Sequence, residues 1–317
     1  MKLCVVGCGH ISAMHGPAFA RCAAEEPSLE LAACCDPDLA RADAFAGRYG
    51  FARRYADMEQ MLAQERPDAA VLLTPVTLTA RLSVELIRRR IPVLLEKPPG
   101  LNTAETEQII RAARETGTPH MVAFNRRHMP LVRRLRELTA GERVRFAEYA
   151  FYRVNRLDAD FSTTAIHGVD TVRFLCRSAY RRVRFTYQPA GELGAANIFL
   201  DCEMESGALA RLNFLPCTGV LAERAVLHAE NKLYYAALPV AGSVDGDGLL
   251  LRAENGRVEK WPGEAQSEAE AEGFYGENRA FLQCVRAGIQ PEDDAQSGLQ
   301  AVEIADCIRR RAAEYRA

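Results

Sequence analysis

The sequence predicts an α/β fold class, with an N-terminal doubly wound parallel sheet and a C-terminal α+β domain that has a mostly antiparallel open sheet. The first half alternates short apolar runs with helical patterns, which is typical of a parallel sheet covered by helices. Strand candidates in the second half are longer, alternate polar with apolar residues and follow one another mostly through turns. A length of 317 residues also exceeds the size at which one core usually stops growing. We therefore expect two domains, residues 1–123 and 124–317.

The first domain is expected to contain strands that alternate with helices along the chain. Asn102, followed three positions later by Glu105, resembles a capping box and marks the start of the last helix. The expected strands are 3–6, 29–35, a weak one at 52–55, 69–73, 92–95 and 120–123, and the expected helices are 11–25, 39–49, 58–64, 78–90 and one from Asn102 to about residue 116.

The second domain is expected to form an antiparallel sheet with helices against one face. Its strand candidates are 144–154, 182–188, 195–204, 207–214, 222–229 and 232–236, with weaker ones at 249–252 and 258–261. Helical patterns at 130–138, 164–175, 269–287 and 295–313 are expected to cover that face. The other face is a candidate surface for self-association into a homo-oligomer, although such a face can also be covered within one chain.

Composition favours a globular protein with a small-molecule partner. Hydrophobic residues make up 48% of the chain and charged residues 26%, close to the average for globular proteins. The net charge of −2 comes from 40 basic and 42 acidic residues mixed along the sequence, which gives no broad field for nucleic acid or anionic lipid. No stretch approaches the roughly 20 apolar residues of a membrane span. We expect neither a nucleic-acid partner nor a membrane.

The cysteines and histidines give no sign of a disulfide framework or a metal site. The ten cysteines lie mostly inside apolar patterns, with no Cys-x-x-Cys pair, and the six histidines are dispersed without zinc-ligand spacing. The start of the chain has no signal-peptide pattern. We therefore expect a cytoplasmic protein with reduced thiols and no metal.

Residues that carry chemistry begin directly after the first strand, with Gly7-Cys8-Gly9-His10-Ile11-Ser12. Glycines between a strand and a helix let backbone N–H groups approach a pyrophosphate at the positive end of the helix. Ser12 stands where the G-x-G-x-x-G pattern has its third glycine, so the match is degenerate. An ordinary tight turn is the alternative. With the surrounding strand and helix, the loop predicts a Rossmann-type dinucleotide-binding domain.

A carboxylate follows the second strand at the distance that this fold requires. Asp36 can accept hydrogen bonds from the ribose hydroxyls of a bound adenosine, and it would repel a 2′-phosphate. We therefore expect NAD, with NADP less favoured. The alternative is that Asp36-Pro37-Asp38 is plain turn chemistry.

Two further segments follow strands whose carboxyl ends present ligands in doubly wound sheets. Thr74-Pro75 follows the fourth strand, and Glu96-Lys97-Pro98-Pro99 follows the fifth. A lysine directly after a buried strand is partly desolvated, which lowers its pKa and suits it to relay a proton. Alternatively, Lys97 is a surface lysine in a proline-rich turn.

Together these segments resemble those of the Gfo/Idh/MocA oxidoreductases, over nearly the whole chain. The resemblance also covers the tail, where residues 288–291 precede a final helix. It implies a Rossmann domain joined to an open antiparallel sheet, and the oxidation or reduction of sugars, inositols and related polyols. The matching segments are Gly7-Cys8-Gly9-His10-Ile11, Cys35-Asp36-Pro37, Thr74-Pro75, Glu96-Lys97-Pro98, Phe124-Asn125-Arg126-Arg127 and Ile166-His167-Gly168-Val169-Asp170.

By this resemblance Lys97 and His167 are the catalytic residues and handle the hydroxyl proton during hydride transfer. Judged by its apolar helical surroundings alone, His167 would be a packed core group. The cofactor contacts implied are Gly7, Gly9, His10, Ile11, Asp36, Thr74, Pro75, Glu96, Lys97 and Asn125. The substrate candidates are Arg126, Tyr152, Arg153, Thr163 and Asp170. Basic and phenolic groups suit a hydroxylated or acidic substrate, but each candidate has a structural alternative, such as a pair between Asp170 and Arg173 or another basic neighbour.

The chain departs from the family pattern at the residues nearest the chemistry. Thr163 stands where the family usually has an aspartate, and a threonine cannot accept a proton at neutral pH. Asp158 and Asp160 lie upstream as substitutes, or serve only to keep the loop soluble. Val76 and Thr79 stand where the family commonly has asparagine and histidine.

These observations favour an NAD-dependent dehydrogenase or reductase that acts on a CH–OH group of a sugar, polyol or related molecule. The departures motivate an alternative, a dinucleotide-binding sensor or assembly protein that has lost the usual chemistry. A third, weaker hypothesis is an elimination or hydrolysis that uses the nicotinamide transiently.

Overall fold

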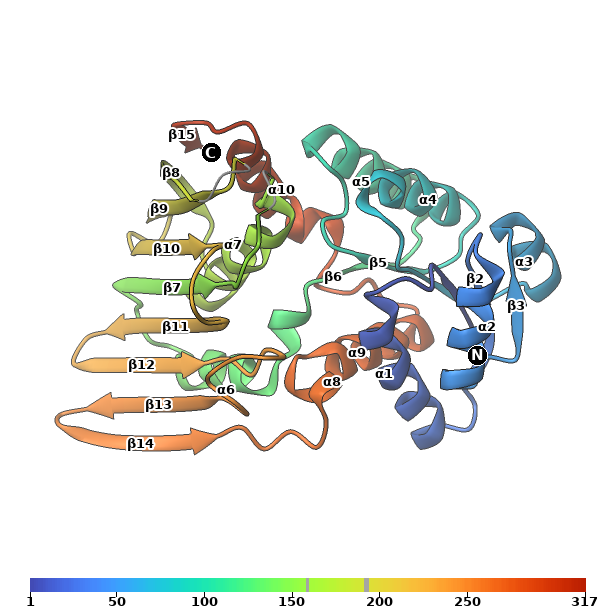
Figure 1. The fold of residues 1–317 in the computed structure, drawn as a ribbon, viewed down its shortest axis with the longest axis horizontal. Helices are drawn as coiled ribbons and strands as arrows, with labels where there is room; N and C mark the ends of the chain where they lie inside the picture. The colour runs from blue at the N-terminus through green and yellow to red at the C-terminus, as the bar shows by residue number, and fades with distance from the viewer. Residues whose placement is uncertain (158–159, 191–193) are drawn as a thin grey trace. The chain divides into compact units, whose positions relative to one another are not determined.

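The computed structural model describes residues 1–157, 160–190 and 194–317 and divides into two compact units (Figure 1). Unit 1 comprises residues 1–125 and 274–302, and unit 2 comprises residues 126–273 and 303–317. Neither unit is one unbroken stretch of sequence. The predicted boundary after residue 123 lies two residues before the end of the first stretch, and residues 274–302 return to unit 1.

Unit 1 contains the predicted doubly wound sheet. Its six strands are all parallel, in the order β3-β2-β1-β4-β5-β6, so the winding reverses between β1 and β4. Such a reversal is where these sheets bind ligands. The strands are β1 (Lys2–Val6), β2 (Glu30–Cys35), β3 (Arg53–Tyr55), β4 (Ala69–Leu72), β5 (Val93–Glu96) and β6 (His120–Ala123), and the helices are α1 (Ser12–Glu25), α2 (Leu39–Tyr49), α3 (Met58–Glu65), α4 (Val76–Arg88) and α5 (Thr103–Thr116).

Local signals set the ends of these helices. Asp38 caps α2 by accepting from the N–H groups of Ala40 and Arg41. Asn102 caps α5 as predicted, because its Oδ1 accepts the Glu105 N–H at 3.0 Å. Glu105 completes the cap by accepting the N–H of Leu101. Each cap satisfies amides that have no partner inside the helix.

The helix predicted over 269–287 is two helices, α8 (Glu268–Ala271) and α9 (Phe274–Ala287). Gly273, with φ of +89°, separates them. The expectation that this segment covers the second sheet is wrong for α9, which packs against α1 in unit 1. Apolar periodicity shows that a helix has a buried face, but it does not identify the partner. The last helix, α10 (Ala295–Arg309), is shorter than predicted, and a short strand follows it.

Unit 2 is built on a nine-stranded sheet that is mostly antiparallel, as predicted. Among the described strands the exception is the parallel pair β7–β10. The strand order is β14-β13-β12-β11-β7-β10-β9-β8-β15. The strands are β7 (Phe146–Tyr152), β8 (Tyr180–Pro189), β9 (Ala196–Met204), β10 (Leu209–Leu215), β11 (Ala222–Ala229), β12 (Lys232–Ala237), β13 (Leu249–Glu254), β14 (Arg257–Pro262) and β15 (Glu314–Arg316), and the helices include η1 (Asn125–His128), α6 (Pro130–Leu138) and α7 (Ser162–Cys176).

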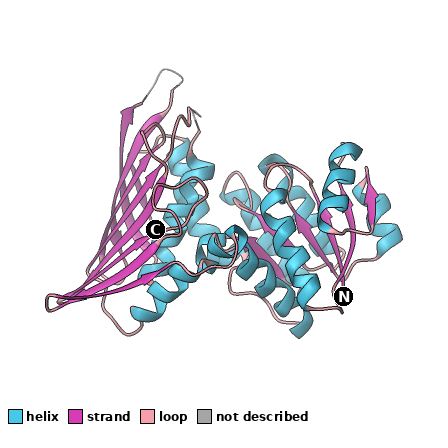
Figure 2. Ribbon diagram, turned by 60° about the horizontal axis from the view of Figure 1, so that its bottom comes forward, coloured by secondary structure: helices cyan, strands magenta, loops and turns pink. Residues whose placement is uncertain are grey.

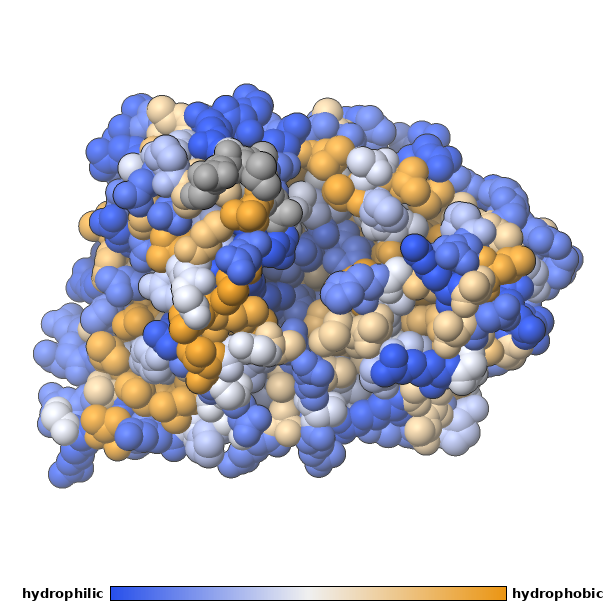
Figure 3. Space-filling view, in the orientation of Figure 1, coloured by the Kyte–Doolittle hydropathy of each residue, from blue (hydrophilic) through white to orange (hydrophobic). Residues whose placement is uncertain are grey.

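Helices cover one face of this sheet, with α6 against β12 and β13 and α7 against β7 and β10. Gly168 lets α7 approach closely, since a Cβ there would lie 2.7 Å from the ring of Phe214. Figure 2 shows the other face without a covering helix among the described residues. On that face Val226, Tyr235 and Leu251 are neighbours in register and only half-buried. Figure 3 shows apolar side chains among polar ones over the strands at the left of the view.

Candidate functional site

The loop after β1 has the form that a pyrophosphate site requires. Gly7 has φ of +99°, and a Cβ on it would collide with the carbonyl oxygen of Leu73, so only glycine fits. Gly9 faces open space, since nothing lies within 4 Å of a Cβ built there. At the start of α1, Ile11 makes no side-chain cap hydrogen bond. An uncapped helix end beside open backbone can bind an anion.

Two other residues of the loop have distinct environments. Ser12, which replaces the third glycine, donates its hydroxyl to the carbonyl oxygen of Gly9 at 2.6 Å and so holds the loop against the helix. His10 is exposed. The predicted cofactor contacts of His10 and Ile11 remain predictions.

Asp36, directly after β2, is buried and held by two backbone amides. Its Oδ2 accepts the N–H of Cys8 at 2.9 Å, and its Oδ1 accepts the N–H of Asp38 at 2.9 Å. The carboxylate is therefore fixed between the phosphate loop and the start of α2. The bond to Asp38 is the turn chemistry given as the alternative, and the bond to Cys8 ties this turn to the loop.

The segment after β4 is organised by a threonine. Pro75 is the N-cap residue of α4, and the hydroxyl of Thr79 lies 3.4 Å from the carbonyl oxygen of Thr74 and 3.3 Å from that of Pro75. Thr79 is buried. At the position where the family commonly has histidine, this chain therefore has a residue that bonds its own helix turn.

Glu96 and Lys97 follow at the end of β5, where a buried network surrounds the glutamate. Glu96 Oε2 accepts the Lys97 N–H at 3.0 Å, and Oε1 lies 3.1 Å from Nε2 of His15. His15 is fully buried and also contacts Asn278. Sequence reasoning missed both residues, since neither belongs to a recognised motif. Asn125, another predicted contact, is buried at the end of this stretch of unit 1.

In unit 2, the buried carboxylate of Glu223 gathers three side chains, and one of them contacts His167. Glu223 on β11 accepts from Arg126 (Nη2–Oε1 2.7 Å), from Arg153, and from the hydroxyl of Tyr149 at 2.9 Å. Arg126 Nη1 lies 3.3 Å from His167 Nε2. Because a guanidinium only donates, this contact makes Nε2 an acceptor and favours the neutral ring. Glu223 was missed because its nearest sequence neighbours carry no motif.

The charges in this network set its protonation. Burial alone would raise the pKa of Glu223, but the adjacent Arg126 and Arg153 outweigh burial and lower it to about 2. Burial, together with the Glu223 charge, raises the pKa of Tyr149 well above its usual value. Glu223 is therefore a carboxylate, and Tyr149 remains a hydrogen-bond donor at neutral pH.

The remaining substrate candidates lie in different environments. Asp170 forms a bidentate pair with Arg127, with contacts of 2.8 and 2.5 Å. This is the structural alternative, an ion pair within the protein, with Arg127 as the partner in place of Arg173. Thr163 lies one turn before His167 on α7 and is half-buried. Tyr152 is not brought to the cluster, since alternation along β7 places it on the opposite face from Tyr149.

One of the two aspartates that could substitute upstream of α7 supports the start of that helix. Asp160 accepts the N–H of Ser162 at 2.9 Å and so supports the first turn of α7. Asp158 lies outside the described residues. Lys97 belongs to unit 1 and His167 to unit 2, so their predicted pairing remains a prediction.

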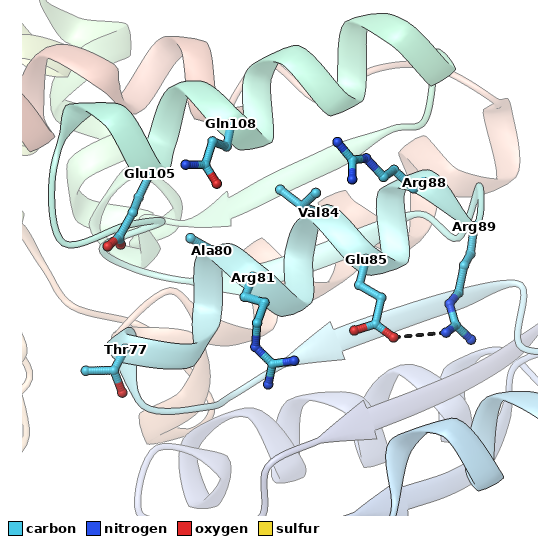
Figure 4. A pocket seen from close by; sticks show the side chains of 9 residues that line it. All are labelled: Thr77, Ala80, Arg81, Val84, Glu85, Arg88, Arg89, Glu105 and Gln108. Carbon is cyan, nitrogen blue, oxygen red and sulfur yellow. Dashed lines mark hydrogen bonds and ion pairs between the residues drawn. The ribbon is translucent and has the colours of Figure 1, made fainter.

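A groove of about 630 Å³ opens on unit 1 between α4 and α5 (Figure 4). It contains none of the predicted site residues, and its side chains carry both signs of charge, as in the Glu85–Arg89 pair at 3.0 Å. No group of potential metal ligands occurs among the described residues. None of the helices in the described part of the chain is both long and apolar enough to cross a bilayer.

Residues 1–124 match the model of the GFO_IDH_MocA family, described as an oxidoreductase family with an NAD-binding Rossmann fold. Over these residues the chain belongs to the Gfo/Idh/MocA family. An NAD(P) dinucleotide is therefore the cofactor of unit 1, and the uncapped start of α1 and the fixed Asp36 fit such a group.

Among curated relatives, a scyllo-inositol 2-dehydrogenase (NADP(+)) of Bacillus subtilis is 31% identical over 119 residues. That match covers 38% of this chain and only 36% of the relative. An inositol 2-dehydrogenase of Rhizobium meliloti is 23% identical over 98% of this chain and 97% of its own length.

Solved structures share the whole two-unit fold at low identity. A dehydrogenase from Chromobacterium violaceum has a TM-score of 0.85 at 23% identity and covers 96% of this chain and 93% of its own. A Gfo/Idh/MocA family oxidoreductase from Vibrio cholerae has a TM-score of 0.83 at 20% identity and covers 98% of this chain and 97% of its own.

Proposed function

We propose that this protein is an NAD-dependent dehydrogenase or reductase that acts on a carbinol carbon of a sugar, polyol or related hydroxylated small molecule. The observation that carries the proposal is the contact of His167 Nε2 with the buried Arg126 guanidinium, which favours a neutral histidine able to take up a proton. The substrate class is supported by relatives named as dehydrogenases of inositol, a D-glucoside and D-apiose.

The residues of unit 1 would hold the cofactor. Gly7, Gly9 and the first amides of α1 would bind the pyrophosphate, and Asp36 would accept hydrogen bonds from the adenosine ribose. Because the Asp36 carboxylate is fixed by two amides, it cannot turn away from a 2′-phosphate without breaking both hydrogen bonds. This favours NAD over NADP.

The nicotinamide would supply the hydride acceptor or donor, and the side chains of the chain would handle the proton. Lys97 would stabilise the developing charge on the substrate oxygen, and His167 would accept the hydroxyl proton during oxidation and return it during reduction. Arg126 would keep His167 neutral and would have to release Nε2 when that nitrogen takes up the proton, and Glu223 offsets the charge of the guanidinium.

A rate assay with NAD or NADH and a panel of sugars and inositols tests the proposal. Substrate-dependent change in nicotinamide absorbance is expected, and Lys97→Ala should lower kcat by about 10²- to 10⁴-fold. The control is Lys260→Ala, which removes an exposed lysine from β14. Parent-like turnover by Lys97→Ala would contradict the assigned role of Lys97.

The sensor or assembly alternative is favoured by Thr163 and Thr79, which stand where acidic and imidazole groups are usual. It predicts normal NAD binding without turnover across the panel. A Thr163→Asp variant that gains activity absent from the parent would support it. Robust parent activity that depends on Lys97 would eliminate it.

We also propose that the uncovered sheet face of unit 2 mediates self-association. Its half-buried Val226, Tyr235 and Leu251 form an apolar row across three strands. Light scattering after size exclusion should give more than one chain mass for the parent and a smaller particle for Tyr235→Lys. A monomeric parent would refute the proposal.

A further inference from the structure

A buried histidine connects the segment after β5 to a helix from the far end of the chain. We propose that His15 and Asn278 are positioning residues for Lys97, and that they act through the carboxylate of Glu96. The inference rests on the proposed function of Lys97, which is to stabilise the charge that develops on the substrate oxygen. It assigns a role in catalysis to α9, which contains none of the recognised motifs.

The connection consists of three successive hydrogen bonds. Asn278 Oδ1 lies 2.9 Å from His15 Nδ1, His15 Nε2 lies 3.1 Å from Glu96 Oε1, and Glu96 Oε2 accepts the backbone N–H of Lys97 at 3.0 Å. His15 and Asn278 are 0% exposed and Glu96 is 7% exposed. Solvent therefore has little access to these hydrogen bonds and cannot readily replace them.

The partners of the imidazole ring determine how it binds. Asn278 presents an amide oxygen and Glu96 a carboxylate oxygen, and both are acceptors. Each ring nitrogen therefore faces an acceptor atom, and the contact with Oε1 joins the ring to Glu96. Removing the ring would leave the buried Oε1 of Glu96 without this partner, so the geometry of Glu96 depends on the ring.

Further contacts fix the orientation of His15. Asn278 Nδ2 also donates to the His15 carbonyl oxygen at 3.4 Å, which sets the orientation of the amide. The ring of Phe274 meets the imidazole edge to face, with centroids 5.0 Å apart. His15 is therefore held by two residues of α9 and has little freedom to follow a displaced Glu96.

The position of Glu96 explains why this network acts on Lys97. Glu96 is the last residue of β5, and its side chain bonds the amide of the next residue. That bond fixes the backbone where the lysine side chain leaves the sheet. A displacement of about 1 Å at a reacting group is enough to cost two orders of magnitude in rate. Loss of His15 or Asn278 should therefore lower kcat with little effect on NAD binding.

The lysine content of the chain makes this position directly observable. Only four lysines occur, Lys2, Lys97, Lys232 and Lys260. Reductive methylation with ¹³C-formaldehyde gives each one a resonance, and the spectrum of Lys97→Arg assigns that of Lys97. We expect His15→Ala and Asn278→Ala to shift the Lys97 resonance and leave the other three in place.

A matched control and a conservative variant separate positioning from folding. His120→Ala removes another buried histidine of unit 1, which accepts the Ala295 N–H at 3.1 Å. It should leave the Lys97 resonance unchanged. Asn278→Asp keeps an acceptor for His15 and should retain the parent resonance, while Asn278→Ala should not. Thermal unfolding identifies any variant that fails to fold, and Asn278→Ala then stands in for His15→Ala.

Kinetics complete the test. We expect kcat to fall about 10- to 100-fold in His15→Ala and Asn278→Ala, with KM for NAD within about threefold. An unchanged Lys97 resonance in both folded variants, or an equal shift in His120→Ala, would overturn the inference. If the parent shows no turnover, the proposed function fails, but the resonances still decide whether His15 and Asn278 position Lys97.

Discussion

The two units hold their candidate functional groups in different ways. In unit 1 the phosphate loop, Asp36 and Lys97 each lie directly after a strand, and backbone amides or carbonyls fix much of their geometry. In unit 2 His167 depends on Arg126, which depends in turn on Glu223, a residue far away along the chain. Sites built from backbone leave a motif in the sequence, whereas sites built from buried side-chain pairs do not.

This difference changes the interpretation of the basic substrate candidates. The sequence indicates that Arg126 and Arg153 suit a hydroxylated or acidic substrate. Both bind Glu223, so a substrate would meet guanidinium groups that already have a carboxylate partner. We expect the main effect of Arg126 to be on the orientation and protonation of His167.

The largest expected effect is in unit 2. Glu223→Gln should lower the free energy of unfolding by about 3–5 kcal/mol, because two buried guanidiniums lose their shared counter-charge. Chemical denaturation measures it. Asp245→Asn is the control, since it breaks the more exposed Arg224–Asp245 pair and should cost about 1 kcal/mol or less. Equal losses in the two variants would contradict the proposed importance of burial.

The pH dependence of stability should show the same network. The pKa of Glu223 is about 2 in the folded state, and 4.5 is the ordinary value that the unfolded chain would have. A depressed folded pKa stabilises the protein above the unfolded value, and that contribution, about 3 kcal/mol, is lost as pH falls from about 4.5 towards 2. Glu223→Gln should flatten the unfolding free energy over this range. A parent-like slope in the variant would assign the acid sensitivity to other carboxylates.

In unit 1 the effect of a glycine substitution on stability and on NAD affinity should depend on the single backbone position that is changed. Gly7→Ala should lower both stability, by about 1–3 kcal/mol, and NAD affinity, because its Cβ meets a backbone carbonyl. Gly9→Ala has room and should keep the parent unfolding temperature, but should lose NAD affinity if the pyrophosphate passes there. Calorimetry and cofactor titration distinguish the two. Identical behaviour would show that the two glycines do not have these separate roles.

A smaller effect, on the preference between NAD and NADP, is expected from substitution of Asp36. Asp36→Ser removes the charge that disfavours a 2′-phosphate, so the ratio of NADP to NAD affinity should rise about tenfold, or about 1.4 kcal/mol. Part of the NAD affinity should be lost as well, since the Cys8 and Asp38 amides lose their acceptor. Competitive titration of both cofactors measures the ratio. An unchanged ratio would leave the turn as the only role of Asp36.

Most of the fold could be predicted from sequence because its elements carry local signals. The parallel strands are continuous apolar runs, and the Asn102 cap fixes a helix start. The unit against which α9 packs could not be predicted, since the apolar face of a helix fits any complementary surface. The same limit applies to the His15–Glu96 contact, which joins α1 to the end of β5.

The sequence by itself determined the two-part architecture, the phosphate loop, the acidic residue after β2 and the lysine after β5. Each of these follows from chain-local physics, such as strand periodicity, glycine conformations and the amides of a helix start. Only the tertiary structure decided which buried polar groups pair, because a contact such as Arg126–Glu223 or His15–Glu96 depends on the burial and proximity of segments far apart along the chain. Such contacts lower the pKa of Glu223 and hold Arg126 beside His167.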